Sequence, residues 1–190
     1  MSVEIRSEDH RSLAAYATIP IAFEIREALS RPTLGLIAGP LESHPVARAY
    51  VKGYDALPRN HPLDWPSRFD VRRAHFLAAY LGARRVGGAV VIVDPADATR
   101  LGSEPSLALL WDLRVAPDVR RRGIGHALLT IAESHSRATL SHGLVVETQD
   151  VNVPACRFYA GAGYALTRIT PSAYPTLPDE MQLVWTKSFE

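Results

Sequence analysis

The sequence feature that most constrains the fold is an abrupt change of pattern within "SLALLWDLRVAPDVRRRGIGHALL", residues 106–129. Before Pro117, apolar and polar residues alternate, and this predicts a β-strand with two distinct faces. After Gly123, the apolar residues recur at spacings of three and four, and this predicts a helix from about Gly123 to about Leu140. The chain must therefore pass from a strand to a helix through a short loop rich in arginine and glycine.

The same spacing assigns residues to the faces of these two elements. One strand face is expected to carry Leu107, Leu109, Trp111, Leu113 and Val115, and the other Ala108, Leu110, Asp112 and Arg114. The buried side of the helix is expected to carry Ile124, Ala127, Leu128, Ile131 and Ala138. The second strand face therefore holds the polar groups that could do chemistry.

The elements on either side of this unit predict a mixed sheet. Residues 74–93 contain two apolar runs around a glycine turn at 82–85, which is typical of a hairpin, and a polar insertion follows at about 94–105. The segment "LVVETQ" predicts a buried strand, "NVPACRFYAGAG" a helix, and "YALTRIT" and "MQLVWTK" two more strands. Prolines interrupt the first third, where "IAFEIREAL" predicts a strand in its first half. Because a strand, a crossover helix and a second strand normally form a parallel unit, the fold class is α/β or α+β.

Composition limits the classes of partner. The chain has 190 residues and a net charge of +1, so we expect a single domain over residues 1–190 and no nucleic-acid partner. The single cysteine, Cys156, allows no internal disulfide, and the seven histidines show no paired metal spacing, so no metal is expected. The charged start and the lack of a long apolar run predict no signal peptide and no membrane partner. We expect a soluble, cytoplasmic protein that is a monomer or a homodimer.

The loop of arginines and glycines is suited to binding an anion. A helix that begins after a glycine turn presents unpaired N–H groups and the positive end of its dipole. Three consecutive arginines at 120–122 add charges that pair with phosphate. A nucleotide P-loop is excluded because His126 stands where that motif needs lysine, and a Rossmann fingerprint because Leu128 replaces its third glycine. The alternative at this point is a solvated basic turn.

Two motifs together resemble the GNAT superfamily of N-acetyltransferases. The first is Arg-x-x-Gly-x-Gly, formed by Arg120, Gly123 and Gly125 between a strand and a long helix. The second is Asn-x-x-Ala-x-x-Phe-Tyr-x-x-x-Gly-aromatic, which begins at Asn152 and ends at Tyr164. Within the superfamily, "WDLRVAPDVRRRGIG" and "ETQDVNVPACRFY" look most like the streptothricin acetyltransferases, and the match is specific over about residues 107–164.

The resemblance implies a GNAT-type fold, with a largely antiparallel sheet, a central splayed parallel strand pair and flanking helices. It also implies acetyl-CoA as the co-substrate, with its pyrophosphate at the loop and its pantetheine arm between the splayed strands. Asn152 would contact CoA, and Tyr159 would protonate the departing thiolate. The residues implied to contact the cofactor are Leu113, Arg114, Val115, Arg120, Arg121, Arg122, Gly123, Ile124, Gly125, His126, Asn152, Ala155 and Tyr159.

Acetyl transfer to an amine needs a group that removes a proton from the ammonium ion, whose pKa is about 10.4 for a lysine-like amine. Asp112 is the first candidate for proton acceptor or ammonium anchor, and its alternative role is an ion pair with Arg114. Glu147 is the second candidate, with a structural hydrogen bond as its alternative, and an ordered water could replace both. Cys156 is expected to be packing rather than a nucleophile.

The expected function is transfer of the acetyl group of acetyl-CoA directly to a primary amine of a small molecule, such as a streptothricin-like antibiotic or a polyamine-like acceptor. Residues 1–73 are expected to shape the acceptor site, where the resemblance is poorest. One alternative is a protein or peptide N-acetyltransferase, for which a shallow open groove would be expected. Others are a non-catalytic acetyl-CoA-binding regulatory module and a basic nucleic-acid binder.

Overall fold

The centre of the fold is a mixed sheet, seen in a computed structural model that describes residues 2–30, 32, 34–35, 41–93 and 106–189. Seven strands form this sheet in the order β1-β4-β5-β6-β7-β9-β8. Their bounds are Glu4–Glu8 for β1, Ala74–Leu81 for β4, Arg84–Ile92 for β5, Leu107–Val115 for β6, Gly143–Gln149 for β7, Ala165–Thr170 for β8 and Gln182–Ser188 for β9. The predicted strands and the predicted hairpin are confirmed. The expected polar insertion at about 94–105 lies outside the described residues.

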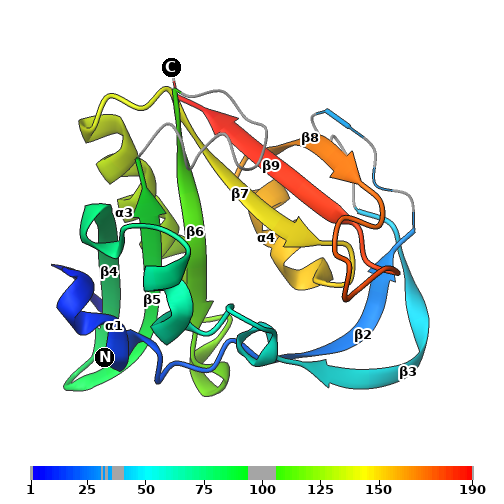
Figure 1. Ribbon diagram of the computed structural model, residues 1–190, viewed down its shortest axis with the longest axis horizontal. Helices are drawn as coiled ribbons and strands as arrows, with labels where there is room; N and C mark the ends of the chain where they lie inside the picture. The colour runs from blue at the N-terminus through cyan, green and yellow to red at the C-terminus, as the bar shows by residue number, and fades with distance from the viewer. Residues whose placement is uncertain (1, 31, 33, 36–40, 94–105, 190) are drawn as a thin grey trace.

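The sheet divides at its centre, between β6 and β7. These neighbours run parallel, whereas the other described strand pairs of the sheet are antiparallel. They are paired only from Leu107 with Gly143 to Leu110 with Val146, and beyond that point the two strands diverge (Figure 1). The predicted fold class, with a splayed parallel pair in a largely antiparallel sheet, is confirmed.

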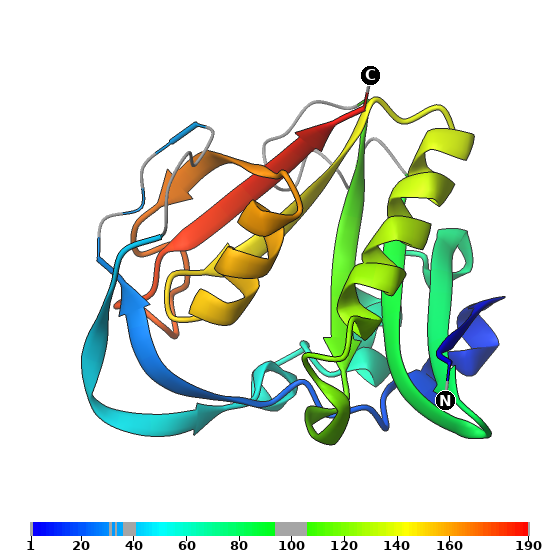
Figure 2. The same cartoon turned by 180° about the vertical axis from the view of Figure 1, so that it is seen from behind.

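Among the described residues, two helices cover one face of the sheet, as the view from behind shows (Figure 2). Helix α3, Ile124–Ala138, lies across β4 to β7, and helix α4, Val153–Gly161, packs on β7. Short N-terminal elements, α1 (Leu13–Tyr16) and the 3₁₀ turn Pro62–Ser67, cover part of the opposite face. The sheet therefore separates two apolar clusters, one with α3 and α4 and one with the N-terminal elements.

The buried stripe of α3 differs from the predicted one. Ile124 and Leu128 are buried as expected, but the stripe continues through Ala132, and Ile131 is 41% exposed. The buried positions follow steps of four residues, so an apolar residue one position earlier points away from the sheet. Ala138, also expected on this side, is exposed.

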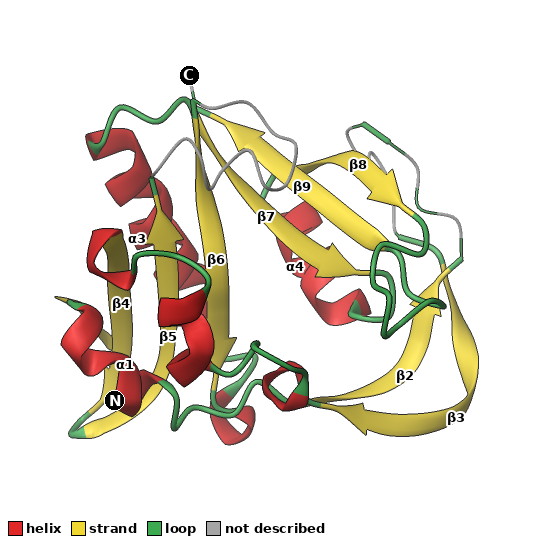
Figure 3. Cartoon of the chain, in the orientation of Figure 1, coloured by secondary structure: helices red, strands yellow, loops and turns green. Residues whose placement is uncertain are grey.

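A separate two-stranded ribbon, β2 and β3, lies outside the sheet, at the lower right of Figure 3. It consists of β2, Phe23–Leu29, and β3, Ser43–Lys52. The predicted strand at the start of "IAFEIREAL" extends to Leu29, whereas β3 was not predicted because most of its residues are exposed and Pro45 lies within it. The ribbon docks on the end of β7 through Ile25, Ala28 and Val151. No helix among the described residues is long and apolar enough to span a membrane.

Two histidines join α3 to the sheet. The rings of His75, on β4, and His135, on α3, stack with their centroids 3.6 Å apart and their planes 6° from parallel. Burial, and then the neighbouring His135, lowers the pKa of His75 to about 4, and burial also lowers the pKa of His135. Protonation of either ring would place a charge in a partly desolvated stack.

This pair predicts a loss of stability at mildly acidic pH. Because the folded-state pKa values lie below the unfolded value of about 6.5, the unfolded chain binds more protons as the pH falls from about 6.5 towards 4. With both rings partly exposed, we expect a loss of about 1 kcal/mol, or roughly 2 to 4 °C in Tm, between about pH 7.5 and about pH 5. Thermal melts across this range should show the decrease in the wild type and a smaller one in His135→Gln. Equal decreases in both proteins would exclude the stack as its source.

Candidate functional site

A cleft of about 600 Å³ opens where β6 and β7 diverge. Its floor is formed by residues 109–114 of β6 and 146–149 of β7, and its sides by residues between 54 and 68 and between 174 and 177. The predicted site residues that line it are Asp112, Leu113, Arg114, Glu147, Asn152, Ala155 and Tyr159. Residues of β6 and β7, of the motif that begins at Asn152, and of the N-terminal segment thus line the same cleft.

A β-bulge in β6 decides which side chains face the N-terminal segment. Val90 of β5 pairs with Asp112 and Val91 pairs with Leu110, so Trp111 is the extra residue on β6. The bulge shifts the alternation by one residue. As a result, Trp111 stays on the predicted face with Leu107 and Leu109, but the assignment is wrong beyond it. Leu113 packs with the α3 cluster, and Asp112 contacts Tyr16 on the opposite face.

The arginine and glycine loop begins α3, as the spacing predicted. Gly123, with φ of 81°, precedes the first helical residue, and Arg121 also has a positive φ of 60°. The guanidinium of Arg120 is directed at the protein's own backbone, since its Nε donates to the carbonyl of Val115 at 2.9 Å and its Nη2 to that of Pro20 at 3.4 Å. Arg121 and Arg122 are exposed. The helix start and these two arginines therefore remain available to an anion.

The loop touches the second motif directly. His126 is exposed, and its ring meets the edge of Phe158 on α4 with centroids 4.8 Å apart. Ile124 is buried beneath the loop, and Gly125 lies beside Phe158 and Leu113. The loop thus lies at the margin of the cleft rather than in its lining.

Helix α4 carries a capped start and a buried phenol. The side-chain oxygen of Asn152 accepts a hydrogen bond from the N–H of Ala155 at 3.3 Å, so Asn152 caps this helix while lining the cleft. Tyr159 is only 5% exposed and also lines the cleft. Burial, followed by the charge of Asp112, raises the pKa of Tyr159, so its phenol keeps its proton at neutral pH.

Cys156, one turn before this tyrosine, is fully buried and contacts the Thr148 hydroxyl at 3.3 Å. Burial raises the pKa of its thiol to about 12, so the thiolate is not populated at neutral pH. This agrees with its expected role as packing.

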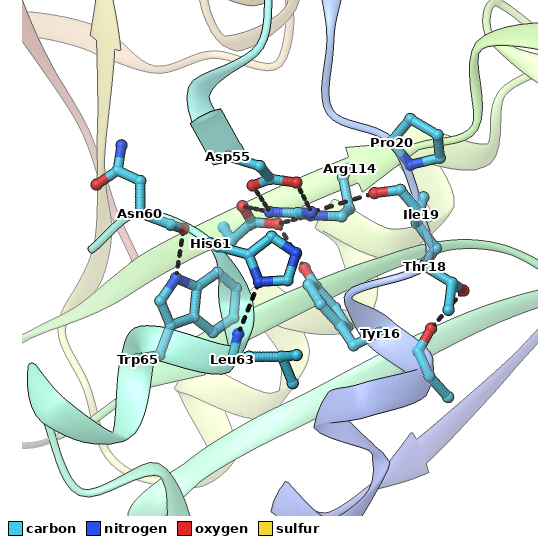
Figure 4. A network of polar contacts seen from close by, with 12 residues as sticks. Tyr16, Thr18, Ile19, Pro20, Asp55, Asn60, His61, Leu63, Trp65 and Arg114 are labelled. Atoms are coloured by element: carbon cyan, nitrogen blue, oxygen red, sulfur yellow. Dashed lines mark hydrogen bonds and ion pairs between the residues drawn. The ribbon is translucent and has the colours of Figure 1, made fainter. Parts of the chain in front are cut away.

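The guanidinium of Arg114 is the most heavily bonded group of the site (Figure 4). Its Nε and Nη2 donate to the two carboxylate oxygens of Asp112, both at 2.8 Å. Its Nη1 and Nη2 donate to Asp55 at 2.8 and 3.1 Å, and Nη1 also donates to the carbonyl of Ile19 at 3.1 Å. These contacts use all five N–H groups of the side chain. Burial alone would lower the pKa of Arg114, but Asp112, Tyr16 and Asp55 raise it above its ordinary value.

Asp112 is consequently held as an ion-pair partner. Both its oxygens bind Arg114, and the phenol of Tyr16 donates to its Oδ1 at 2.5 Å. The Tyr16 ring reaches this position by lying against Gly88 of β5, where a Cβ atom would overlap the ring. Burial and the Asp112 charge raise the pKa of Tyr16, which keeps the donated proton on the phenol. The ion pair with Arg114, the predicted alternative role of Asp112, is what the structure contains.

Glu147 differs from Asp112 in the charge of its hydrogen-bond donors. It accepts hydrogen bonds from the phenol of Tyr174 at 2.5 Å, from Gln182 at 2.8 Å and from Gln149 at 3.2 Å. All three donors are neutral. Burial and the Glu147 charge raise the pKa of Tyr174, so this phenol stays protonated. Glu147 therefore presents a negative charge to the cleft that these contacts do not compensate.

No sequence pattern indicated several of the residues that build the site. Tyr16 and Tyr174 contact the predicted carboxylates Asp112 and Glu147, and Asp55 contacts Arg114, all from segments with no recognisable motif. Their partners lie between 27 and 96 positions away in the chain, so no local pattern could have indicated them. The described residues contain no group of three or more His, Cys, Asp or Glu side chains that could hold a metal ion.

Solved acetyltransferases share this architecture. A protein described as a streptothricin acetyltransferase from Bacillus anthracis, solved with acetyl coenzyme A, matches 100% of both chains with a TM-score of 0.75 and 22% identity. At this identity the likeness shows the fold. The chain belongs to the acetyltransferase (GNAT) family, because the sequence model of that family matches residues 42–164. The family predicted from the two motifs is confirmed.

Curated relatives match a shorter part of the chain. Streptothricin acetyltransferase A of Bacillus subtilis is 36% identical over 84 residues, which are 43% of this chain and 49% of that protein. A streptothricin acetyltransferase of Escherichia coli is 33% identical over 82 residues, or 42% of this chain and 47% of that protein. The match spans about half the length of these relatives.

Proposed function

We propose that the protein is an acetyl-CoA-dependent N-acetyltransferase that acetylates a primary amine of a small molecule, with a streptothricin-like antibiotic as the leading acceptor. The observation that carries this proposal is the cleft at the divergence of β6 and β7, lined by Tyr159 on one helix and Glu147 on one strand. Family membership and the names of the curated relatives support it.

The residues at the margin of the cleft fit acetyl-CoA. Beyond Leu110, β6 has no pairing with β7, which leaves the backbone groups of Leu113 beside the cleft for a pantetheine amide. The backbone groups of Arg114, also predicted to contact the cofactor, point to β5 instead. The carbonyl of Val115 already accepts from Arg120, so this residue would contribute its N–H. The N–H groups that begin α3, together with Arg121 and Arg122, would hold the pyrophosphate. The cofactor supplies an activated acetyl group.

The acceptor would meet an acidic and aromatic surface. Asp55, Asp112 and Glu147 line the cleft, and two of these carboxylates are bonded to Arg114. Glu147 is the one whose recorded partners are neutral, so it would attract the ammonium ion and accept its proton. We therefore favour Glu147 over Asp112 as the base. Walls from residues between 54 and 68 and between 174 and 177 favour a small acceptor over an extended peptide, and residues 1–73 would shape this site.

The chemistry follows from these positions. Once Glu147 has taken a proton from the ammonium ion, the amine nitrogen attacks the thioester carbonyl carbon. The carbon–sulfur bond would then break as Tyr159 donates its proton to the leaving thiolate. The excess proton on the attacking nitrogen would pass to the Tyr159 phenolate, which leaves the neutral amide, the free thiol and the restored phenol. The raised pKa keeps the phenol of Tyr159 protonated at neutral pH, so the group is in the form that can donate this proton.

The first test is binding and turnover. Acetyl-CoA at about 100 times its Kd should stabilise the protein by about 2.7 kcal/mol, or roughly 5 to 10 °C in Tm. A thiol-release assay with a streptothricin antibiotic, a polyamine and a short peptide should show turnover with a small amine. No thermal shift at millimolar acetyl-CoA would contradict the proposal. A shift without turnover on any amine would favour a non-catalytic regulatory module, and turnover of the peptide alone would favour the peptide acetyltransferase.

The second test concerns the phenol of Tyr159. Tyr159→Phe keeps the ring but removes the proton donor, so kcat should fall about 100-fold with the Kd of acetyl-CoA unchanged. Tyr164→Phe is the matched control, because that buried phenol donates to Glu133, which does not line the cleft. Equal activity in Tyr159→Phe and the wild type would reduce Tyr159 to packing.

The third test separates the two carboxylates. Glu147→Gln should lower kcat/KM for the amine about 100-fold with little change in Tm, because neutral donors still surround the new amide. Asp112→Asn should instead lower stability by about 2 to 3 kcal/mol, since it leaves the buried Arg114 with one carboxylate. Measuring Tm and steady-state kinetics for both variants checks the assignment. A stable, inactive Asp112→Asn beside an active Glu147→Gln would reverse it.

A further inference from the structure

We infer that the Arg114 side chain is a positioning residue that fixes the acceptor wall of the cleft to strand β6. The acceptor wall is defined here as residues 54–65, of which Tyr54, Asp55, Leu57, Pro58, Asn60 and Trp65 line the cleft. The inference rests on the proposed function and adds a residue that would set the affinity for the amine.

The contacts of Arg114 link parts of the chain that are distant in sequence. Asp55 is 59 positions away and Ile19 is 95 positions away, and both are bonded to the same guanidinium (Figure 4). The bidentate geometry of the Asp55 contact fixes the orientation of the carboxylate as well as its distance. Because the Arg114 side chain is 1% exposed, solvent screens this ion pair little.

Aromatic rings keep the guanidinium in this orientation. Its Cζ atom lies 5.2 Å from the ring centroid of Tyr16 and 5.7 Å from that of Trp65. Trp65 belongs to the acceptor wall, and its ring also meets that of Trp111 with centroids 6.2 Å apart. The wall therefore packs on β6 at the bulge and is bonded to β6 three residues further on.

A second arginine extends the connection to the helix-start loop. Arg114 donates to the carbonyl of Ile19, and Arg120 donates to the carbonyl of the next residue, Pro20. One arginine comes from β6 and the other from the loop that precedes α3. Residues 19–20 therefore join β6 to the loop that precedes α3. Arg114 also bonds Asp55, so it links the acceptor wall to both of these elements.

The test uses Asp55→Asn and Arg114→Lys, singly and together. Asp55→Asn keeps the shape of the side chain and removes its charge, and Arg114→Lys keeps the charge but cannot form two bidentate contacts. Each should raise the KM for the amine about 10-fold or more, because a misplaced wall holds the acceptor in the wrong geometry, while the Kd of acetyl-CoA stays within about 2-fold. The KM for the amine in the double variant should be no higher than in the single variant with the higher KM, because both changes break the same contact.

The matched control is Asp118→Asn, which removes the charge from an exposed bidentate pair with Arg84. It should leave the KM for the amine and the Kd of acetyl-CoA unchanged. Additive effects in the double variant would overturn the inference, because they would mean that Asp55 contacts the amine by itself. Loss of acetyl-CoA affinity in either single variant would also overturn it.

Hydrogen exchange gives a readout that needs no turnover. In Asp55→Asn, amides of residues 54–65 should exchange faster than in the wild type, whereas amides of β7 and β9 should not change. Unchanged exchange in the acceptor wall would overturn the inference. If the wild type acetylates no amine but the wall loosens as expected, the proposed function fails and the positioning role of Arg114 stands.

Discussion

The site depends on the early end of the pairing between β6 and β7. A parallel pair in the middle of a sheet would normally continue along both strands, because unpaired backbone groups inside a protein are costly. Here the pairing stops after Leu110 and Val146, and the strands diverge. The bulge at Trp111 falls at the same point and strengthens the local twist. One irregularity thus creates the opening and turns the polar side chains that follow towards it.

The second determinant is how charge is distributed around the opening. A buried guanidinium is stable only when its donors are satisfied, and Arg114 satisfies all five with Asp112, Asp55 and a backbone carbonyl. Because Asp112 is held in this ion pair, it is poorly placed to accept a proton from the amine or to bind its ammonium ion. Glu147, by contrast, is surrounded by amide and phenol donors that orient it without neutralising it. Two carboxylates that look equivalent in sequence therefore differ in their surroundings: Asp112 is paired with a buried charge, and Glu147 is not.

The fold between residues 107 and 164 could be predicted because its signals are local: alternation, helical spacing, glycine turns and two short motifs. The bulge could not be predicted, since the extra residue at Trp111 exists only relative to the register of β5. Strand β3 was missed because exposure on both faces removes the apolar alternation. The partners Tyr16, Asp55 and Tyr174 depend on long-range docking, which leaves no pattern in any one segment. The assigned roles of Tyr159, Asn152 and the loop arginines stay predictions.

Gly88 has a consequence beyond the strand that contains it. It carries no functional group and does not line the cleft, yet the Tyr16 ring lies where its side chain would be. A methyl group at this position would displace the phenol that donates to Asp112, and the Arg114 network would have to rearrange around it. A selection for variants with altered acceptor preference could therefore recover changes at position 88, although inspection of the cleft alone would never nominate that residue.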